Sequence, residues 1–136
     1  MGLIDFVKSA GKALGIVDYD AIKKELEGNG LKSGGLDINV DGDKVVLEGM
    51  PDDPNEREKI ITAIGNIEGI AAVEDNMEGD AASDFYTVRP GDTLSAIAQK
   101  SYSDGSKYQK IFEANKPMLS HPDKIYPGQV LIIPTD

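Results

Sequence analysis

The apolar positions in the last third of the chain predict a strand, two helices and a final strand. Residues 86–88 favour a strand, and the Pro90-Gly91 pair that follows ends it in a turn. The next helix has apolar residues at the i, i+3, i+4 spacing of one helical face: Leu94, Ile97 and Ala98. A second helical window covers 106–115, and an apolar strand over 130–133 stops at a proline.

The middle of the chain predicts a helix, a hairpin, a second helix and a third strand. The first helix is expected over 19–27, and residues 36–49 then contain two strands joined at the turn signal Asp41-Gly42. Asp53 followed by proline marks the start of another helix, which should break at 65–69. The order predicted for this segment is therefore helix, two strands, helix and strand.

The first fifteen residues have the spacing of a short amphipathic helix. Its apolar stripe consists of Leu3, Phe6, Val7, Ala10 and Leu14. Gly11 and Gly15 weaken its end, and a helix of this length is unstable alone. Because two lysines are few for a membrane-surface helix, we expect it to pack on the rest of the protein.

Composition restricts the partners and the location. The 136-residue chain carries a net charge of −10, distributed as +1 over 1–17, −10 over 18–79 and −1 over 80–136. This charge argues against nucleic acid or an anionic membrane and favours cations, although a solvated acidic surface has the same pattern. The sequence shows no signal peptide and no apolar run of about 20 residues, so we expect a cytoplasmic protein without a membrane span. We also expect a monomer.

No residue pattern supports catalysis, so we predict that the protein is not an enzyme. There is no cysteine, and the single histidine, His121, lies in a polar loop where a solvated surface role is expected. Asp37, Asp41 and Asp43 look like a fragment of a calcium loop. The EF-hand pattern requires a Glu at its twelfth position, whereas this segment continues as a strand, which favours a hairpin turn.

The C-terminal segment resembles the LysM domain. The resemblance rests on Gly91-Asp92-Thr93-Leu94 at the first turn, Glu113-Ala114-Asn115 at the end of the second helix, and Ile125-Tyr126-Pro127-Gly128-Gln129 before the last strand. LysM modules bind N-acetylglucosamine glycans such as peptidoglycan in a shallow groove. The resemblance implies that this groove would comprise Gly91, Asp92, Thr93, Leu94, Met118, Ile125 and Tyr126.

The middle segment resembles the BON domain through its element order and the run Gly69-Ile70-Ala71-Ala72-Val73 after the second helix. We therefore expect an α+β protein with helices on one face of a three-stranded sheet. The expected division is an N-terminal helix over 1–17, a BON domain over 18–78, a linker over 79–84 and a LysM domain over 85–136.

The whole chain resembles the family of small cytoplasmic bacterial BON–LysM proteins that bind potassium. The distinctive stretches are Phe6-Val7-Lys8, residues 63–70, Phe85-Tyr86-Thr87-Val88 and residues 111–119. The resemblance implies selective, reversible binding of K⁺, with a change in compactness and no catalysis. Glycan binding, with peptidoglycan fragments as partners, is the alternative, and a general stress-related scaffold is the third possibility.

The requirements of potassium predict where a site would lie. Known potassium filters replace the ion's hydration shell with backbone carbonyls, and the C-terminus of a helix offers carbonyls without intrahelical partners. Two glycine-broken helix ends, at 7–11 and 65–70, could supply them, unless these glycines serve only as helix caps. The predicted ligands are the main-chain oxygens of Val7, Ala10, Gly65, Ile67 and Ile70.

Overall fold

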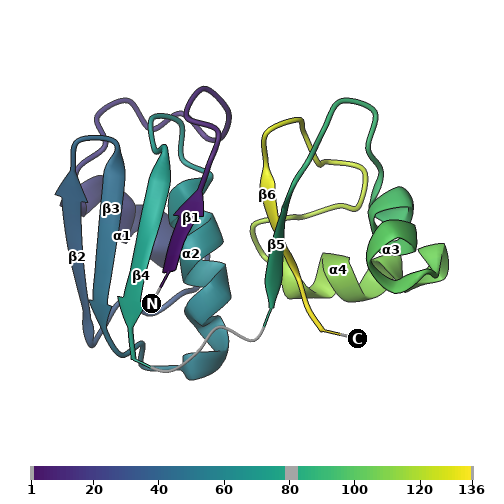
Figure 1. Ribbon diagram of the computed structural model, residues 1–136. Helices are drawn as coiled ribbons and strands as arrows, with labels where there is room; N and C mark the ends of the chain where they lie inside the picture. Colours follow the sequence, from purple (N-terminus) through teal and green to yellow (C-terminus); the bar gives the residue numbers. More distant parts are fainter. Residues whose placement is uncertain (1, 79–82, 136) are drawn as a thin grey trace.

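The computed structural model describes residues 2–78 and 83–135, which form two α+β units lying side by side (Figure 1). The first unit (residues 2–78) contains a four-stranded sheet and two helices, with a 3-10 turn over Pro54–Glu56. Its elements are β1 (Gly2–Asp5), α1 (Tyr19–Gly28), β2 (Leu36–Asp41), β3 (Lys44–Gly49), α2 (Arg57–Gly65) and β4 (Ala72–Met77). The predicted order of helix, two strands, helix and strand is confirmed from α1 onward.

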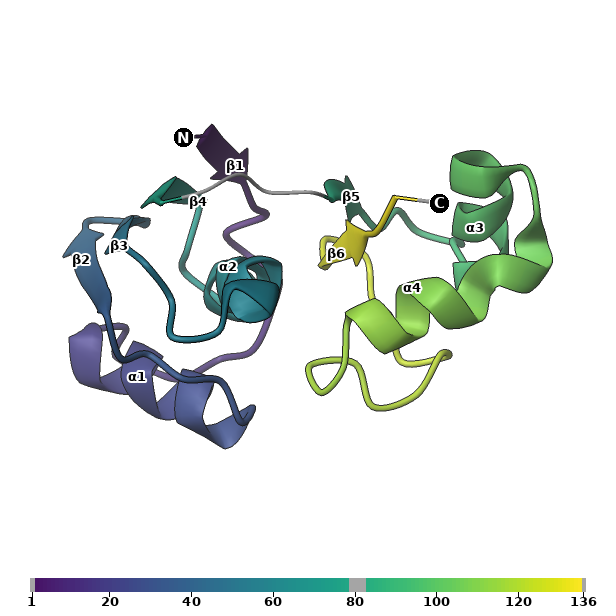
Figure 2. The ribbon, with the colours of Figure 1, turned by 90° about the horizontal axis from the view of Figure 1, so that it is seen from below.

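The sheet of the first unit has the order β1-β4-β3-β2, and α1 and α2 cover one of its faces (Figure 2). β2 and β3 form the predicted antiparallel hairpin, with Gly42 at φ +64° in its turn. β3 and β4 are parallel, and α2 is the connection between them. The core between sheet and helices includes the fully buried Ile22, Leu47, Ile60 and Val73.

The expectation of an N-terminal helix is wrong. Residues 2–5 form β1, which pairs antiparallel with β4 so that Ile4 lies opposite Val73. The remainder of the N-terminal segment is a loop in which Gly11 has φ +105° and Gly15 has φ +82°. A glycine-containing segment of this length has little helical stability of its own, and pairing with the free edge of β4 outweighs it. The sheet therefore has four strands instead of the expected three.

An ion pair is buried at the end of the first unit. Arg57, the first residue of α2, donates from Nη2 to Asp75 Oδ2 of β4 at 2.8 Å, and both side chains are 5% exposed. The guanidinium also donates from Nη1 to the Glu78 carbonyl at 2.6 Å, and Asp75 Oδ1 accepts from the Met77 amide at 3.0 Å. These bonds tie the beginning of α2 to the last residues of β4.

The second unit (residues 83–135) has the predicted order of strand, two helices and strand. Its elements are β5 (Asp84–Thr87), α3 (Leu94–Tyr102), the 3-10 turn η2 (Gly105–Lys107), α4 (Tyr108–Ala114) and β6 (Val130–Ile133). β5 and β6 pair antiparallel, and Thr93 caps α3 by accepting from the Ala96 amide at 3.1 Å. The core of this unit includes Leu94, Ile97, Ile111 and Leu131. The expected linker over 79–84 lies outside the described residues except for 83 and 84.

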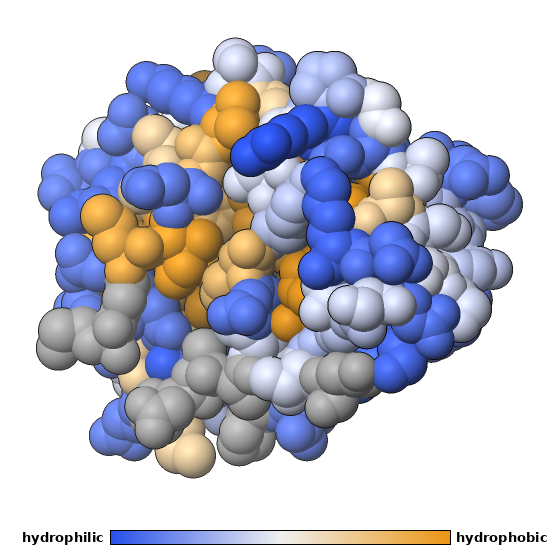
Figure 3. Space-filling model, turned by 45° about the vertical axis from the view of Figure 1, so that its right-hand side comes forward, coloured by the Kyte–Doolittle hydropathy of each residue, from blue (hydrophilic) through white to orange (hydrophobic). Residues whose placement is uncertain are grey.

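The two units meet where α2 faces β6 (Figures 1 and 2). Val130 of β6 is 1% exposed and packs with the core of the first unit. On the face shown in Figure 3, apolar side chains gather over the first unit, and the surface of the second unit is largely polar. The contact between α2 and Val130 shows that the two units also pack directly against each other.

Candidate functional site

The N-terminal loop lies against the loop that follows α2, and main-chain hydrogen bonds hold the two together. Phe6 donates to the Ala71 carbonyl at 2.9 Å and Gly69 donates to the Lys8 carbonyl at 2.8 Å. Lys12 then donates to the Asn66 carbonyl at 2.8 Å and accepts from the Glu68 amide at 2.9 Å. The segments 6–12 and 66–71, which are more than fifty residues apart in sequence, therefore form one continuous main-chain arrangement.

Two glycines make this close approach possible. A Cβ on Gly11 would lie 2.1 Å from the Asn66 carbonyl oxygen, and the backbone of Gly11 has φ +105°, where side chains are strongly disfavoured. A Cβ on Gly65 would lie 2.0 Å from the ring of Phe6, which is itself buried. The glycine at the end of α2 therefore leaves room for Phe6 as well as ending the helix.

Four of the five predicted ligand oxygens, those of Val7, Ala10, Ile67 and Ile70, lie in the docked segments, and the fifth belongs to Gly65 at the end of α2. The Val7 carbonyl accepts from the Ala10 amide at 3.0 Å, and the Ile67 carbonyl accepts from the Ile70 amide at 3.2 Å. Among the described residues, no amide donates to the carbonyls of Ala10, Gly65 or Ile70. A carbonyl oxygen has two lone pairs, so even the two bonded oxygens have capacity to spare. Their role as ligands stays a prediction.

The backbone contributes negative potential to this region. Gly65 is the last residue of α2, so its carbonyl lies at the negative end of the helix dipole. Two acidic side chains close to this region pair with lysines: Asp43 with Lys8 at 3.3 Å, and Glu25 with Lys12 at 2.9 Å. In residues 2–78 and 83–135, no group of three or more His, Cys, Asp or Glu side chains could hold a metal ion.

The second unit covers this region from one side. A Cβ on Gly128 would lie 2.6 Å from the Cβ of Ala10 and 3.3 Å from that of Val7, so the turn before β6 packs directly on the N-terminal loop. A cavity of about 250 Å³ lies beside this contact. Its lining includes Gly11, Glu25, Asn66, Met118, Tyr126 and Gln129. The N-terminal loop is therefore enclosed between the loop after α2 and the second unit.

The structure divides the residues of the predicted glycan groove. Met118 and Tyr126 line the cavity at the junction, where burial raises the pKa of the Tyr126 hydroxyl. Thr93 and Leu94 line a different hollow of about 420 Å³, together with His121. Gly91 has φ +87° in the turn before α3, and Ile125 packs on the core of the second unit. Met118 and Tyr126 therefore line one hollow, and Thr93 and Leu94 line another.

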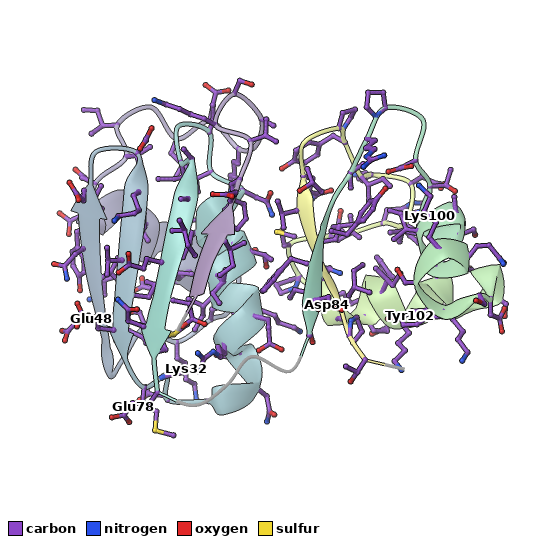
Figure 4. All side chains as sticks on the ribbon, viewed as in Figure 1. Lys32, Glu48, Glu78, Asp84, Lys100 and Tyr102 are labelled. Atoms are coloured by element: carbon purple, nitrogen blue, oxygen red, sulfur yellow. The ribbon has the colours of Figure 1, made fainter. Side chains whose placement is uncertain are left out.

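Asp92 has a structural task in the second unit. The Tyr86 hydroxyl donates to Asp92 Oδ2 at 2.6 Å, and the Arg89 amide donates to the same oxygen at 2.9 Å. The hydrogen bond from Tyr86 and the one from Arg89 lower the pKa of the Asp92 carboxyl, and the bond to Asp92 raises the pKa of Tyr86. Figure 4 places Lys100 on α3, on the side of the second unit away from the first; its amine lies 5.9 Å from the centre of the Tyr86 ring.

The lowered pKa of Asp92 predicts acid sensitivity in the second unit. Because the folded-state pKa is below the unfolded-state value of about 3.9, the stabilisation is complete above that pH and is lost as the pH falls through the folded-state pKa. We expect Asp92→Asn to flatten this acid limb, measured as melting temperature between pH 6 and 2. An unchanged limb in the variant would show that other carboxylates determine the acid sensitivity.

Comparison with known proteins identifies the class that this fold belongs to. The family model for the BON domain matches residues 20–81, and that for the LysM domain matches residues 86–134. Over its whole length the chain is 45% identical to "Potassium binding protein Kbp" of Escherichia coli O6:H1, and the alignment covers all of that protein. The chain belongs to the family of two-domain BON–LysM proteins that includes this potassium binding protein.

Two uncharacterised proteins are also similar. A protein of Deinococcus radiodurans is 32% identical over 129 residues, which are 84% of this chain and 50% of that protein. "Uncharacterized protein YqbP" of Bacillus subtilis is 40% identical over 63 residues, which are 40% of this chain and 29% of that protein. Within the described residues, no helix is long and apolar enough to cross a membrane.

The sequence predicted that the two segments of the candidate site lie together, but it did not predict that the second unit covers them. Asn66 and Gly128 join the second unit to this region; the sequence indicated them only as members of the 65–70 and 125–129 stretches and predicted no contact for either. Asn66 is the residue that could have indicated a contact here, because it is a polar residue within a glycine-rich helix end. In the structure it is only 6% exposed. A buried amide needs hydrogen-bond partners, and the sequence alone does not say where they come from.

Proposed function

We propose that this protein binds K⁺ selectively through the main-chain oxygens of Val7, Ala10, Gly65, Ile67 and Ile70. The observation that carries the proposal is the docking of the N-terminal loop on the end of α2, with three of these five carbonyls accepting no amide among the described residues. A large monovalent ion suits several neutral oxygens better than one hydrated carboxylate. The C-terminal end of α2 adds a favourable field for a cation.

The full-length relative named as a potassium binding protein supports the same ion. The similarity covers both units and therefore includes both docked segments. The function proposed is binding without catalysis, in the cytoplasm, as a sensor or buffer of K⁺.

A change in compactness follows from where the ligands lie. Val7 and Ala10 belong to a loop, whereas Gly65, Ile67 and Ile70 belong to the end of α2 and the turn after it. An ion shared by both sets holds the loop in place, and Gly128 of the second unit packs on that loop. The proposed consequence is that K⁺ binding favours the arrangement in which the two units are packed together.

The test is a comparison of KCl and NaCl at equal ionic strength. An ion that binds only the folded state adds RT ln(1 + [L]/Kd) to stability, about 2.7 kcal/mol at a hundredfold excess over Kd. We expect K⁺ to raise the melting temperature and to shift the backbone amide signals of residues 6–12 and 65–71, with a smaller effect of Na⁺. Identical melting curves and spectra in the two salts would contradict the proposal.

The LysM match keeps glycan binding as a second candidate, although its groove residues lie in two places. The same preparation should be incubated with insoluble peptidoglycan. Retention on peptidoglycan without a potassium-specific response would replace K⁺ binding with glycan binding.

A further inference from the structure

Asn66 lies at the centre of the candidate site and also extends out of it. It is the C-cap of α2, directly between Gly65 and Ile67, and its own carbonyl accepts from the Lys12 amide at 2.8 Å. Its side chain crosses to the second unit. Nδ2 donates to the Val130 carbonyl at 2.8 Å, and Oδ1 accepts from the Val130 amide at 2.8 Å.

These two bonds reproduce the pairing of a β-strand. A carboxamide donates and accepts as a peptide unit does, so Asn66 occupies the edge of β6 that β5 leaves open. The second unit has the same device of its own: Asn115, the C-cap of α4, donates to the Ile132 carbonyl at 2.9 Å and accepts from its amide at 2.8 Å. The outer edge of β6 is thus completed by one asparagine from each unit.

The contact with Val130 is buried, and this makes it selective for the packed arrangement. Asn66 is 6% exposed and Val130 is 1% exposed. If the Asn66 side-chain amide were removed, the amide and carbonyl of Val130 would be buried without partners in the packed arrangement. Once the units separate, water would form hydrogen bonds with both groups. Removing the Asn66 amide therefore penalises packing of the second unit and does not penalise the separated state.

We propose that Asn66 is the positioning residue that couples cation binding to packing of the second unit. This inference rests on the proposed function. An ion held by the carbonyls of Gly65 and Ile67 fixes the Gly65–Asn66 peptide unit and, one residue further on, the Ile67–Glu68 unit. The Lys12 amide holds the carbonyl between them, so the backbone on both sides of Asn66 is fixed and with it the direction in which the Asn66 side-chain amide reaches Val130. By linkage the effect is reciprocal: packing of β6 on Asn66 raises the affinity for the ion by the same factor.

The test uses the full chain with Asn66→Ala, and Asn115→Ala as the matched control. Asn66 has φ −84°, which alanine adopts without strain, so the end of α2 can persist. The readouts are the Kd for K⁺ from the amide signals of residues 65–71, hydrogen exchange of the Val130 amide in KCl and NaCl, and the radius of gyration from X-ray scattering.

In the wild-type chain, we expect the Val130 amide to exchange more slowly in KCl than in NaCl. In Asn66→Ala, that difference should disappear, the radius of gyration should no longer respond to K⁺, and Kd should rise about tenfold or more, within the usual range of coupling between sites. Asn115→Ala should expose the Ile132 amide equally in both salts and leave Kd within about twofold of wild type.

Two results would overturn the coupling while leaving the proposed function intact. One is a wild-type Val130 amide equally protected in KCl and NaCl although K⁺ binds, a measurement that does not depend on any variant folding. The other is Asn66→Ala with wild-type Kd and compaction. A wild-type chain with no potassium-specific response removes the proposed function, and the coupling with it.

Discussion

Replacing Arg57 by methionine should destabilise the first unit by about 3–5 kcal/mol, because it leaves the Asp75 carboxylate buried without its partner. The same change removes the donors to the carbonyls of Met77 and Glu78, at the end of β4. Chemical denaturation of the wild type and of Arg57→Met, followed by circular dichroism, measures the loss directly. A lowered midpoint with an unchanged slope would show that stability alone has changed.

Two further variants show whether the buried charge is the cause. Arg57→Met combined with Asp75→Leu should recover most of the loss, because an apolar pair leaves no unpaired charge inside the protein. Lys44→Met breaks the pair between Lys44 and Glu74, whose side chains are about one-third exposed, and should have a much smaller effect. A double variant as unstable as Arg57→Met would assign the loss to packing rather than to the charge.

The sequence was informative wherever local periodicity and tertiary structure agree. The hairpin at Asp41-Gly42 and the order of elements in the second unit were predicted because turn chemistry and apolar spacing point the same way there. The N-terminal segment was predicted wrongly for the opposite reason. Its apolar residues fit a helical stripe, but its first residues complete a sheet whose free edge is formed by β4, seventy residues away.

The same distinction applies to the candidate site. The helix end expected at Gly65 is confirmed, whereas the one expected at 7–11 is wrong because Gly11 lies in a loop; the two segments nevertheless lie together. The pairing of Asn66 with Val130 could not be predicted, because one carboxamide replacing a strand leaves no repeating pattern. The division of the glycan-groove residues was equally hidden, since it depends on which face of the second unit packs on the first.

Gly11→Ala should abolish the response to K⁺, although no carbonyl is removed. The new Cβ would lie 2.1 Å from the Asn66 carbonyl oxygen and 2.7 Å from its carbon, and main-chain atoms cannot move aside as a flexible side chain does. Relief requires the N-terminal loop to lift away, which breaks the bond from Lys12 to Asn66. The carbonyls of Val7 and Ala10 would then leave those at the end of α2. Titration with KCl and NaCl, followed by the amide signals of residues 65–71, measures the loss.

Gly15→Ala is the matched control for backbone strain. Gly15 lies in the same loop with φ +82°, but a Cβ there would meet no atom within 4 Å. Both variants therefore incur the cost of a side chain at positive φ, of order 1–3 kcal/mol, and only Gly11→Ala adds the collision with Asn66. We expect Gly15→Ala to bind K⁺ with nearly the wild-type Kd. Equal loss of binding in both variants would show that strain in the loop is the cause. Wild-type binding by Gly11→Ala would exclude Val7 and Ala10 as ligands, because their loop must lift to accept the new methyl group.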